Sequence, residues 1–157
     1  MFGRLKTIAR NALRGKNYKV IAHKCFARIR PERSADALNW AQNICEPYAP
    51  YLHKLDPGIW DETQKESLIL KDHGRAVLKK IPHDLGGGGN TDLLYFMVRF
   101  FKPRTVLETG VAAGWSSQAI LTALDKNESG TLYSSDFPYF RIENPEQYIG
   151  EIGRAHV

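Results

Sequence analysis

The residues of this 157-residue chain that could do chemistry surround a turn with two glycines. An apolar stretch ends on Glu108, Gly110 and Gly114 follow, and a helical pattern begins directly afterwards. A second apolar stretch ends on Asp136. A strand, a glycine turn, a helix and a second strand closed by a carboxylate form the unit with which α/β proteins bind an adenosine group. The spacing therefore predicts a nucleotide or nucleoside site at this turn.

The residues between the two carboxylates each have a physical role in such a site. Gly110 can take a backbone conformation that residues with a Cβ avoid, and it lets a ligand lie against the main chain. Ala112 keeps the turn small, and Gly114 lets the next helix start close to the strand. Free N–H groups at that helix start, with the hydroxyls of Ser116 and Ser117, suit a bound carboxylate.

Two longer motifs carry a family resemblance. The stretch E-T-G-V-A-A-G-W-S-S, which begins at Glu108, and the later L-Y-S-S-D-F-P-Y-F resemble bacterial class I methyltransferases of the small-molecule O-methyltransferase type. The resemblance covers residues 86–150. It implies S-adenosylmethionine as the cofactor, with the ammonium near Glu108, the ribose hydroxyls on Asp136 and the adenine on Phe137. Four positions match the cofactor motif: Glu108, Gly110, Gly114 and Asp136.

The resemblance also implies the reaction, which is methyl transfer to a hydroxyl group of a small-molecule substrate. No catalytic residue follows from it. His83 and Asp84 are the only nearby candidates for a base, and neither is assigned that role. No metal site is predicted, because the histidines stand without a second ligand at metal spacing. Whether the reaction uses a metal stays open.

Two other functions stay open beside the methyltransferase. An enzyme that binds NAD would use the pattern G-x-G-x-x-G, but residue 112 is Ala and position 108 already holds an acid. A noncatalytic protein would use the α/β unit as a scaffold and a basic arm to bind a membrane or nucleic acid. The joint presence of Glu108, Gly110, Gly114 and Asp136 favours the methyltransferase.

The elements that position these residues are predicted to form an α/β protein, the start of a Rossmann-like class I methyltransferase domain over residues 86–150. Its first two strands are expected to be parallel. A mainly helical region, residues 34–85, precedes it, and Gly74 could break its second helix. The predicted elements are helices over 34–45, 62–81, 91–101 and 115–124 and strands over 105–107 and 131–135. Tyr95 is expected on a polar helix face, and Gln118 is expected to face outward.

The N-terminal arm, residues 1–33, holds ten Lys or Arg residues and one acid. Helical spacing of apolar residues over 2–13 predicts an amphipathic helix that docks on its own domain, with attachment to an anionic membrane surface as the alternative. No nucleic-acid partner is expected. Two widely spaced cysteines, Cys25 and Cys45, indicate reduced thiols. We therefore expect a cytoplasmic protein, with peripheral attachment to the inner membrane as the open alternative.

The last seven residues, 151–157, spell E-I-G-R-A-H-V. This heptapeptide is the translation of a string that resembles a common sequencing adapter, so we expect it to be an assembly scar. The natural gene is then expected to continue past Gly150, and this chain is expected to be an inactive N-terminal fragment.

Overall fold

The computed structural model describes residues 6, 10, 18–29, 34–137, 139 and 141–153. The chain divides into two compact units, Met1–Pro47 with Pro138–Asn144 and Tyr48–Phe137 with Pro145–Val157. Most of the amphipathic helix predicted over residues 2–13 lies outside the described residues, as do residues 154–157. Among the described residues, no helix is both long and apolar enough to cross a bilayer.

The described residues of the first unit include helices α2 (Tyr18–Ile29) and α3 (Ser34–Ile44). Helix α3 begins at Ser34, which the sequence indicates as its N-cap, and it ends at Ile44, before Pro47. An exposed ion pair joins the Arg10 guanidinium to Glu143, with 3.4 Å between the paired atoms. It connects the N-terminal arm to the segment 138–144 within the same unit.

The second unit begins with α4 (Tyr48–Leu55) and α5 (Pro57–Leu78). The Asp56 carboxylate caps α5 by accepting a hydrogen bond of 2.9 Å from the Ile59 N–H, and proline suits the first turn because its missing N–H is not needed there. Helix α5 runs through Gly74 without interruption, so the predicted break does not occur.

The α/β part of this unit follows as α6 (Thr91–Phe101), β1 (Thr105–Thr109), α7 (Trp115–Lys126) and β2 (Thr131–Ser135), with a short 3₁₀ turn, η2, over Pro145–Gln147. The two strands pair in parallel, and their register sets Glu108 opposite Ser134. The predicted strand order and direction are thus confirmed, although β1 is two residues longer than expected. The described part of the chain is therefore a mixed α/β structure with a two-stranded parallel sheet.

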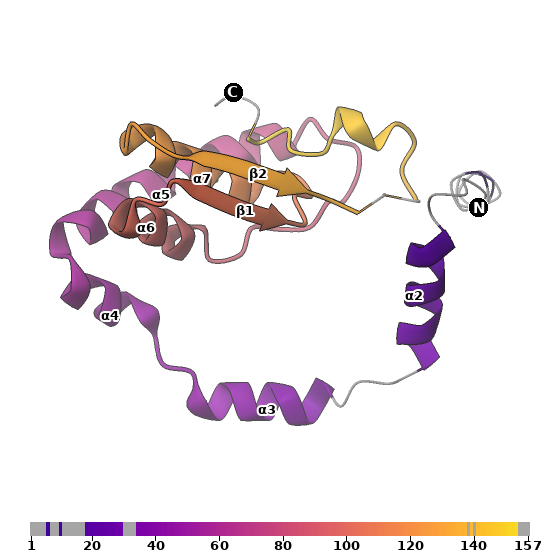
Figure 1. Cartoon of the computed structure of the whole chain (residues 1–157), viewed down its shortest axis with the longest axis horizontal. Coiled ribbons are helices and arrows are strands. Elements are labelled where there is room, and N and C mark those ends of the chain that lie inside the picture. Colours follow the sequence, from indigo (N-terminus) through magenta and orange to yellow (C-terminus); the bar gives the residue numbers. More distant parts are fainter. Residues whose placement is uncertain are drawn as a thin grey trace. The chain divides into compact units, whose positions relative to one another are not determined.

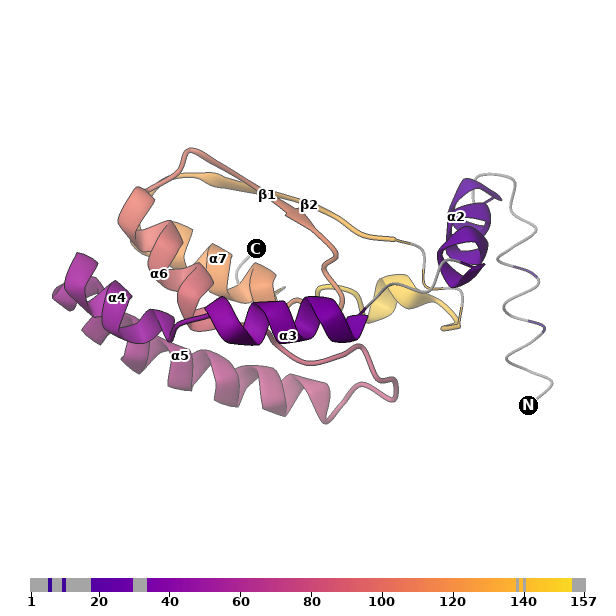
Figure 2. The ribbon, with the colours of Figure 1, turned by 90° about the horizontal axis from the view of Figure 1, so that it is seen from below.

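Helices α6 and α7 lie on one side of the sheet, with α5 beyond them (Figures 1 and 2). Alternate strand residues point to opposite faces. Val106 and Leu132 pack against the core, whereas Leu107 is 74% exposed and Tyr133 is 59% exposed on the other face. The buried core cluster that the helices form comprises Leu70, Tyr95, Val98, Ala119, Ile120, Ala123 and Leu124.

Two side chains expected on polar helix faces are buried instead. Tyr95 is 0% exposed and Gln118 is 1% exposed. Helix α7 is covered by α5 and α6 as well as by β2, so more of its surface is buried than a single amphipathic stripe predicts. Tyr95 fits inside because its hydroxyl donates a hydrogen bond of 2.5 Å to Glu62.

Candidate functional site

The glycine turn joins the carboxyl end of β1 to the start of α7. Gly110, Ala112 and Gly114 all have positive φ, at 83°, 49° and 97°. The Gly110 N–H donates to the Ser135 carbonyl across 2.8 Å, which holds the turn against the end of β2. Positive φ explains the two glycines, and Ala112 takes the same left-handed region despite its Cβ.

The two glycines differ in their surroundings. A Cβ placed on Gly110 would meet no other atom within 4 Å, so the main chain is open to a ligand on that side. A Cβ on Gly114 would lie 3.0 Å from the Cα of Gly150. The turn therefore has one open side, at Gly110, and one side covered by the later segment.

The buried Glu108 carboxylate lies at the centre of a cluster of three serine hydroxyls. Its Oε1 accepts a hydrogen bond from Ser116 across 2.5 Å, and its Oε2 accepts bonds from Ser117 and Ser134, each of 2.7 Å. The residue is only 6% exposed. The carboxylate thus connects β1, β2 and the first turn of α7. Ser116 and Ser117, which the sequence predicts as donors to a ligand carboxylate, donate their hydroxyl hydrogen bonds to Glu108 in this structure.

Sequence reasoning missed Ser134 in this cluster. Its contribution depends on strand register, because Ser134 reaches Glu108 only when the two residues are paired across a parallel ladder. Once β1 and β2 are taken as parallel neighbours, counting back from Asp136 would have identified the serine two residues earlier on the same strand face.

Asp136 closes the turn from the end of β2. Its Oδ2 accepts hydrogen bonds from the Val111 N–H (3.1 Å) and the Ala112 N–H (2.8 Å), and its Oδ1 accepts one from the Phe137 N–H (2.7 Å). The sequence-based expectation that Asp136 adjoins the glycine turn therefore agrees with the geometry. The backbone holds this carboxylate in one orientation at the edge of the turn.

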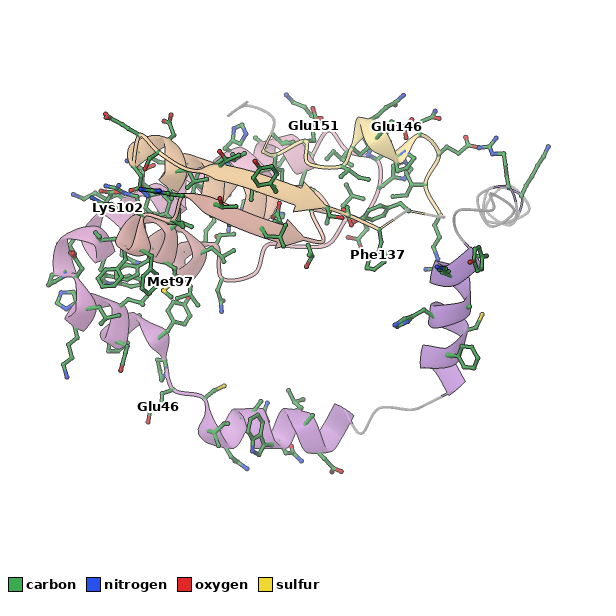
Figure 3. All side chains as sticks on the ribbon, viewed as in Figure 1. Glu46, Met97, Lys102, Phe137, Glu146 and Glu151 are labelled. Carbon is green, nitrogen blue, oxygen red and sulfur yellow. The ribbon has the colours of Figure 1, made fainter. Side chains whose placement is uncertain are left out.

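Phe137 lies just past the carboxyl end of β2, and 67% of it is exposed (Figure 3). The two candidate bases of the sequence are engaged in other interactions: the His83 ring packs edge-on against Tyr148, and Asp84 accepts a hydrogen bond from the Gly86 N–H. Neither contact brings these side chains to Glu108 or Asp136.

The start of α7 has no side-chain cap, because Gly114 occupies the N-cap position. The later segment covers part of this region. The Gly150 N–H donates to Ala112 and the Ile152 N–H donates to Ala113, each across 2.9 Å, and Ile152 is fully buried. Residues 150–153 therefore pack along the turn, including three residues of the heptapeptide that the sequence analysis set aside.

Trp115 connects the glycine-rich loop to the site. A Cβ on Gly74 would lie 2.4 Å from the Trp115 ring, and one on Gly88 would lie 3.1 Å from it. One glycine of α5 and one of the four consecutive glycines before α6 thus make room for an indole at the first position of α7. Gly88 is therefore a position where the backbone approaches a side chain closely.

One ion pair and its neighbouring hydrogen bonds join α5, α6 and the end of α7. The Arg99 Nε donates to Glu62 across 2.7 Å, and Arg99 also donates to the Asn127 side chain. The hydrogen bond from Arg99 holds the pKa of Glu62 below its ordinary value, against the opposing effect of burial. Burial first, and then the hydrogen bond to Glu62, raises the pKa of Tyr95. Glu62 therefore stays charged between α5 and α6.

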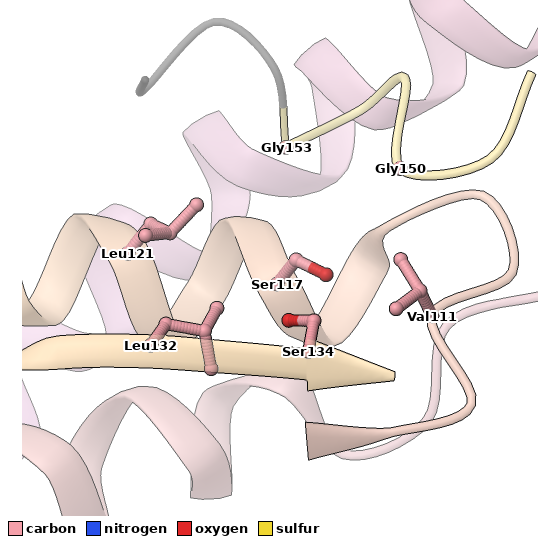
Figure 4. Close-up of a pocket in the computed structure, with 7 residues that line it drawn as sticks. All are labelled: Val111, Ser117, Leu121, Leu132, Ser134, Gly150 and Gly153. Carbon is pink, nitrogen blue, oxygen red and sulfur yellow. The ribbon is translucent and has the colours of Figure 1, made fainter. Parts of the chain in front are cut away.

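A mainly apolar recess of about 260 Å³ lies between α7, β2 and residues 150–153 (Figure 4). Ser117 and Ser134 lie opposite each other in it, on α7 and β2. The recess is lined by Val111, Ser117, Leu121, Leu132, Ser134, Gly150 and Gly153. It runs along the side of β2, whereas the exposed main chain at Gly110 lies at the strand end.

Comparison with known proteins identifies no relative, since no family model, no curated protein and no solved structure matches this chain. An open main chain at Gly110, an uncapped helix start and a fixed carboxylate at Asp136 stand together at the carboxyl end of a parallel sheet. This edge is where open α/β sheets bind their ligands.

Proposed function

We propose that this protein binds S-adenosylmethionine at the glycine turn. We propose further that it is part of a class I methyltransferase that acts on a hydroxyl group of a small molecule. The observation that carries the proposal is the juxtaposition of Gly110, whose main chain is open, with Asp136, whose carboxylate is held against the same turn. The proposed domain is Rossmann-like, with β1 and β2 as its first two strands.

The residues present fit an adenosyl cofactor. A carboxylate has about four acceptor positions, and three backbone N–H groups already donate to Asp136, so we propose that the ribose hydroxyls share or displace these donors. Gly110 leaves space for the ligand beside the main chain. Helix α7 is twelve residues long and starts without a side-chain cap, so its first N–H groups suit the carboxylate of the methionyl group. Phe137 is exposed at the strand end and is proposed to pack on the adenine.

We propose a positioning role for Glu108, beside the contact with the cofactor ammonium that the resemblance implies. Its two oxygens accept three hydroxyl hydrogen bonds, so we propose that it holds the first turn of α7 and the end of β2 in the geometry that binds the cofactor. Any interaction of Glu108 with the cofactor ammonium would compete with these bonds. Glu108 is thus a positioning residue in this proposal.

The cofactor supplies an electrophilic methyl group on a sulfonium. Gly110, Asp136 and the start of α7 would hold this cofactor, which would supply the methyl carbon for transfer to a substrate hydroxyl oxygen. The protein residues bind and align the reactants, and alignment alone provides a large part of such a rate enhancement. The exposed thiols of Cys25 and Cys45 fit a reducing compartment, which supports a cytoplasmic location.

The test is calorimetric titration of the chain with S-adenosylhomocysteine and, separately, with NAD. We expect binding of the first ligand only. Asp136→Ala should weaken it by about 1–3 kcal/mol, the range for losing a hydrogen-bond partner that carries charge. Gly110→Val should weaken it at least as much. Leu107→Thr, on the opposite exposed sheet face, is the control and should bind as the parent does. Unchanged affinity in Asp136→Ala would remove this residue from the site.

A further inference from the structure

Helix α2 carries an exposed apolar stripe. Tyr18, Ala22, Cys25 and Phe26 recur at intervals of four, three and one residues, which places them on one face of an α-helix. All four are exposed, with Tyr18 at 62% and Phe26 at 71%. Aromatic side chains at this exposure are costly in water, so the stripe calls for an apolar or interfacial environment.

The same helix has only basic charge. Its sequence, YKVIAHKCFARI, contains two Lys, one Arg and one His and no acidic residue. Lys19 and His23 are exposed, and the Lys19 ammonium lies 5.9 Å from the centre of the Tyr18 ring, beside the stripe. A helix with aromatic residues on one face and cations next to them matches a surface that is negative outside and apolar beneath.

Helix α3 also exposes apolar side chains, so exposure alone does not distinguish α2 from it. Leu38, Trp40 and Ile44 are 58%, 65% and 56% exposed. The sequence of α3, SADALNWAQNI, however, has no Lys or Arg and contains Asp36. The two helices thus present similar apolar exposure with opposite charge, which makes α3 a natural control for α2.

We propose that α2 is a peripheral membrane helix that lies on an anionic lipid surface, with Tyr18 and Phe26 in the interface and its basic residues at the headgroups. Lipid is favoured over nucleic acid because a polyanion in water would satisfy the cations and leave the aromatic stripe exposed. A single twelve-residue helix should bind weakly and reversibly, because stable attachment to a membrane needs a second anchor. The proposal does not depend on methyl transfer.

The experiment is co-sedimentation of the full chain with vesicles. One set contains phosphatidylcholine alone, and the other contains about one part in three of phosphatidylglycerol. We expect pelleting with the anionic set at low salt and release at about 0.5 M salt, where the Debye length falls below about 5 Å. Spinning the chain without vesicles controls for aggregation. Equal pelleting with both lipid sets, or none with the anionic set, would overturn the proposal.

Matched variants locate the contact. Phe26→Ser should lower partitioning into anionic vesicles about tenfold or more, since a buried aromatic side chain is lost. Lys19→Gln should lower it about fivefold, the effect of one cation near a charged bilayer. Trp40→Ser in α3 should change nothing. An equal loss of binding in Trp40→Ser would show that the chain adsorbs to vesicles nonspecifically through its exposed apolar side chains.

Two further readouts separate lipid from other partners. An environment-sensitive dye on Cys25, in a Cys45→Ser background, should shift to the blue on anionic vesicles, whereas the same dye on Cys45 in a Cys25→Ser background should not. Both cysteines are exposed and accept the label. Duplex DNA provides the competing partner. If the chain binds DNA more tightly than vesicles and Phe26→Ser has no effect, the partner of α2 is a polyanion and not a membrane.

Discussion

At the residue scale, the site depends on a buried carboxylate that binds protein groups. Glu108 is 6% exposed and accepts hydroxyl hydrogen bonds from α7 and from β2. A buried charge is costly unless its hydrogen bonds are satisfied. The hydrogen bonds from the serine hydroxyls offset that cost, and the same bonds hold the serine side chains in place. The geometry of the turn therefore depends on the burial of Glu108.

Replacing Ser134 with Ala should destabilise the protein by about 1.5–3 kcal/mol, because a hydrogen bond to a buried charged group is lost. Urea unfolding followed by circular dichroism measures this. Ser135→Ala is the matched control on the same strand, since Ser135 contributes its carbonyl to Gly110 and that group is kept. It should stay within about 0.5 kcal/mol of the parent. Equal losses in both variants would contradict the role assigned to Glu108.

Spacing in the sequence predicted that two glycines and Asp136 meet at one turn, but it did not predict the hydrogen-bond partners of the serine hydroxyls. Gly110, Gly114 and Asp136 follow from spacing, because the backbone chemistry of a glycine turn is local. The destinations of the Ser116 and Ser117 hydroxyls are not local. They depend on how deeply Glu108 is buried and on a register that brings Ser134 alongside it.

At the element scale, close packing at glycines sets the position of α7. Trp115 starts the helix and lies against Gly74 of α5 and Gly88 of the loop before α6. The core side chains of α6 and α7 then meet below the sheet. An amphipathic pattern predicts that these helices exist and roughly where they end. It does not predict that a third helix, α5, also contacts α7 or that Gln118 is buried, because both depend on how the layers assemble.

Gly74→Ala should lower the melting temperature although alanine is the better helix former. Propensity favours alanine by about 1 kcal/mol, but a Cβ 2.4 Å from the indole forces the ring or α5 to move, and overpacking costs about 1–3 kcal/mol. Gly58→Ala in the first turn of α5 is the control. Its Cβ would meet only the Asp56 carboxylate at 3.4 Å, so the melting temperature should hold or rise. A stabilised Gly74→Ala would refute the contact.

The ion pair between α5 and α6 should make stability depend on pH in the acid range. The pKa of folded Glu62 lies below the ordinary glutamate value of 4.5. The stabilisation is therefore fully present above about pH 4.5 and is lost as the pH falls through the lower, folded value. Urea midpoints from pH 7 to 3 should fall more steeply for the parent than for Glu62→Gln. Parallel curves would show that Glu62 contributes nothing.

At the scale of the whole molecule, the sheet is covered on one side only among the described residues. Helices α6 and α7 cover the face of Val106, whereas Leu107 and Tyr133 form an exposed apolar pair on the other. A two-stranded sheet is a marginal structure by itself, so the stability of this unit comes mainly from helix packing. Local patterns in the sequence indicated the α/β class and the parallel strands. They could not indicate that residues 150–153 would pack along the turn, because those contacts join distant parts of the chain.

The central claim is that an adenosyl cofactor binds at the glycine turn, and amide chemical shifts test it most directly. We would add S-adenosylhomocysteine to the ¹⁵N-labelled chain at up to about 1 mM, which detects binding free energies near −4 kcal/mol. The ligand should shift the amide signals of Gly110, Ala112 and Phe137. NAD at the same concentration should leave them unchanged. If the signals of the turn do not move with S-adenosylhomocysteine, or move equally with NAD, the cofactor assignment is wrong.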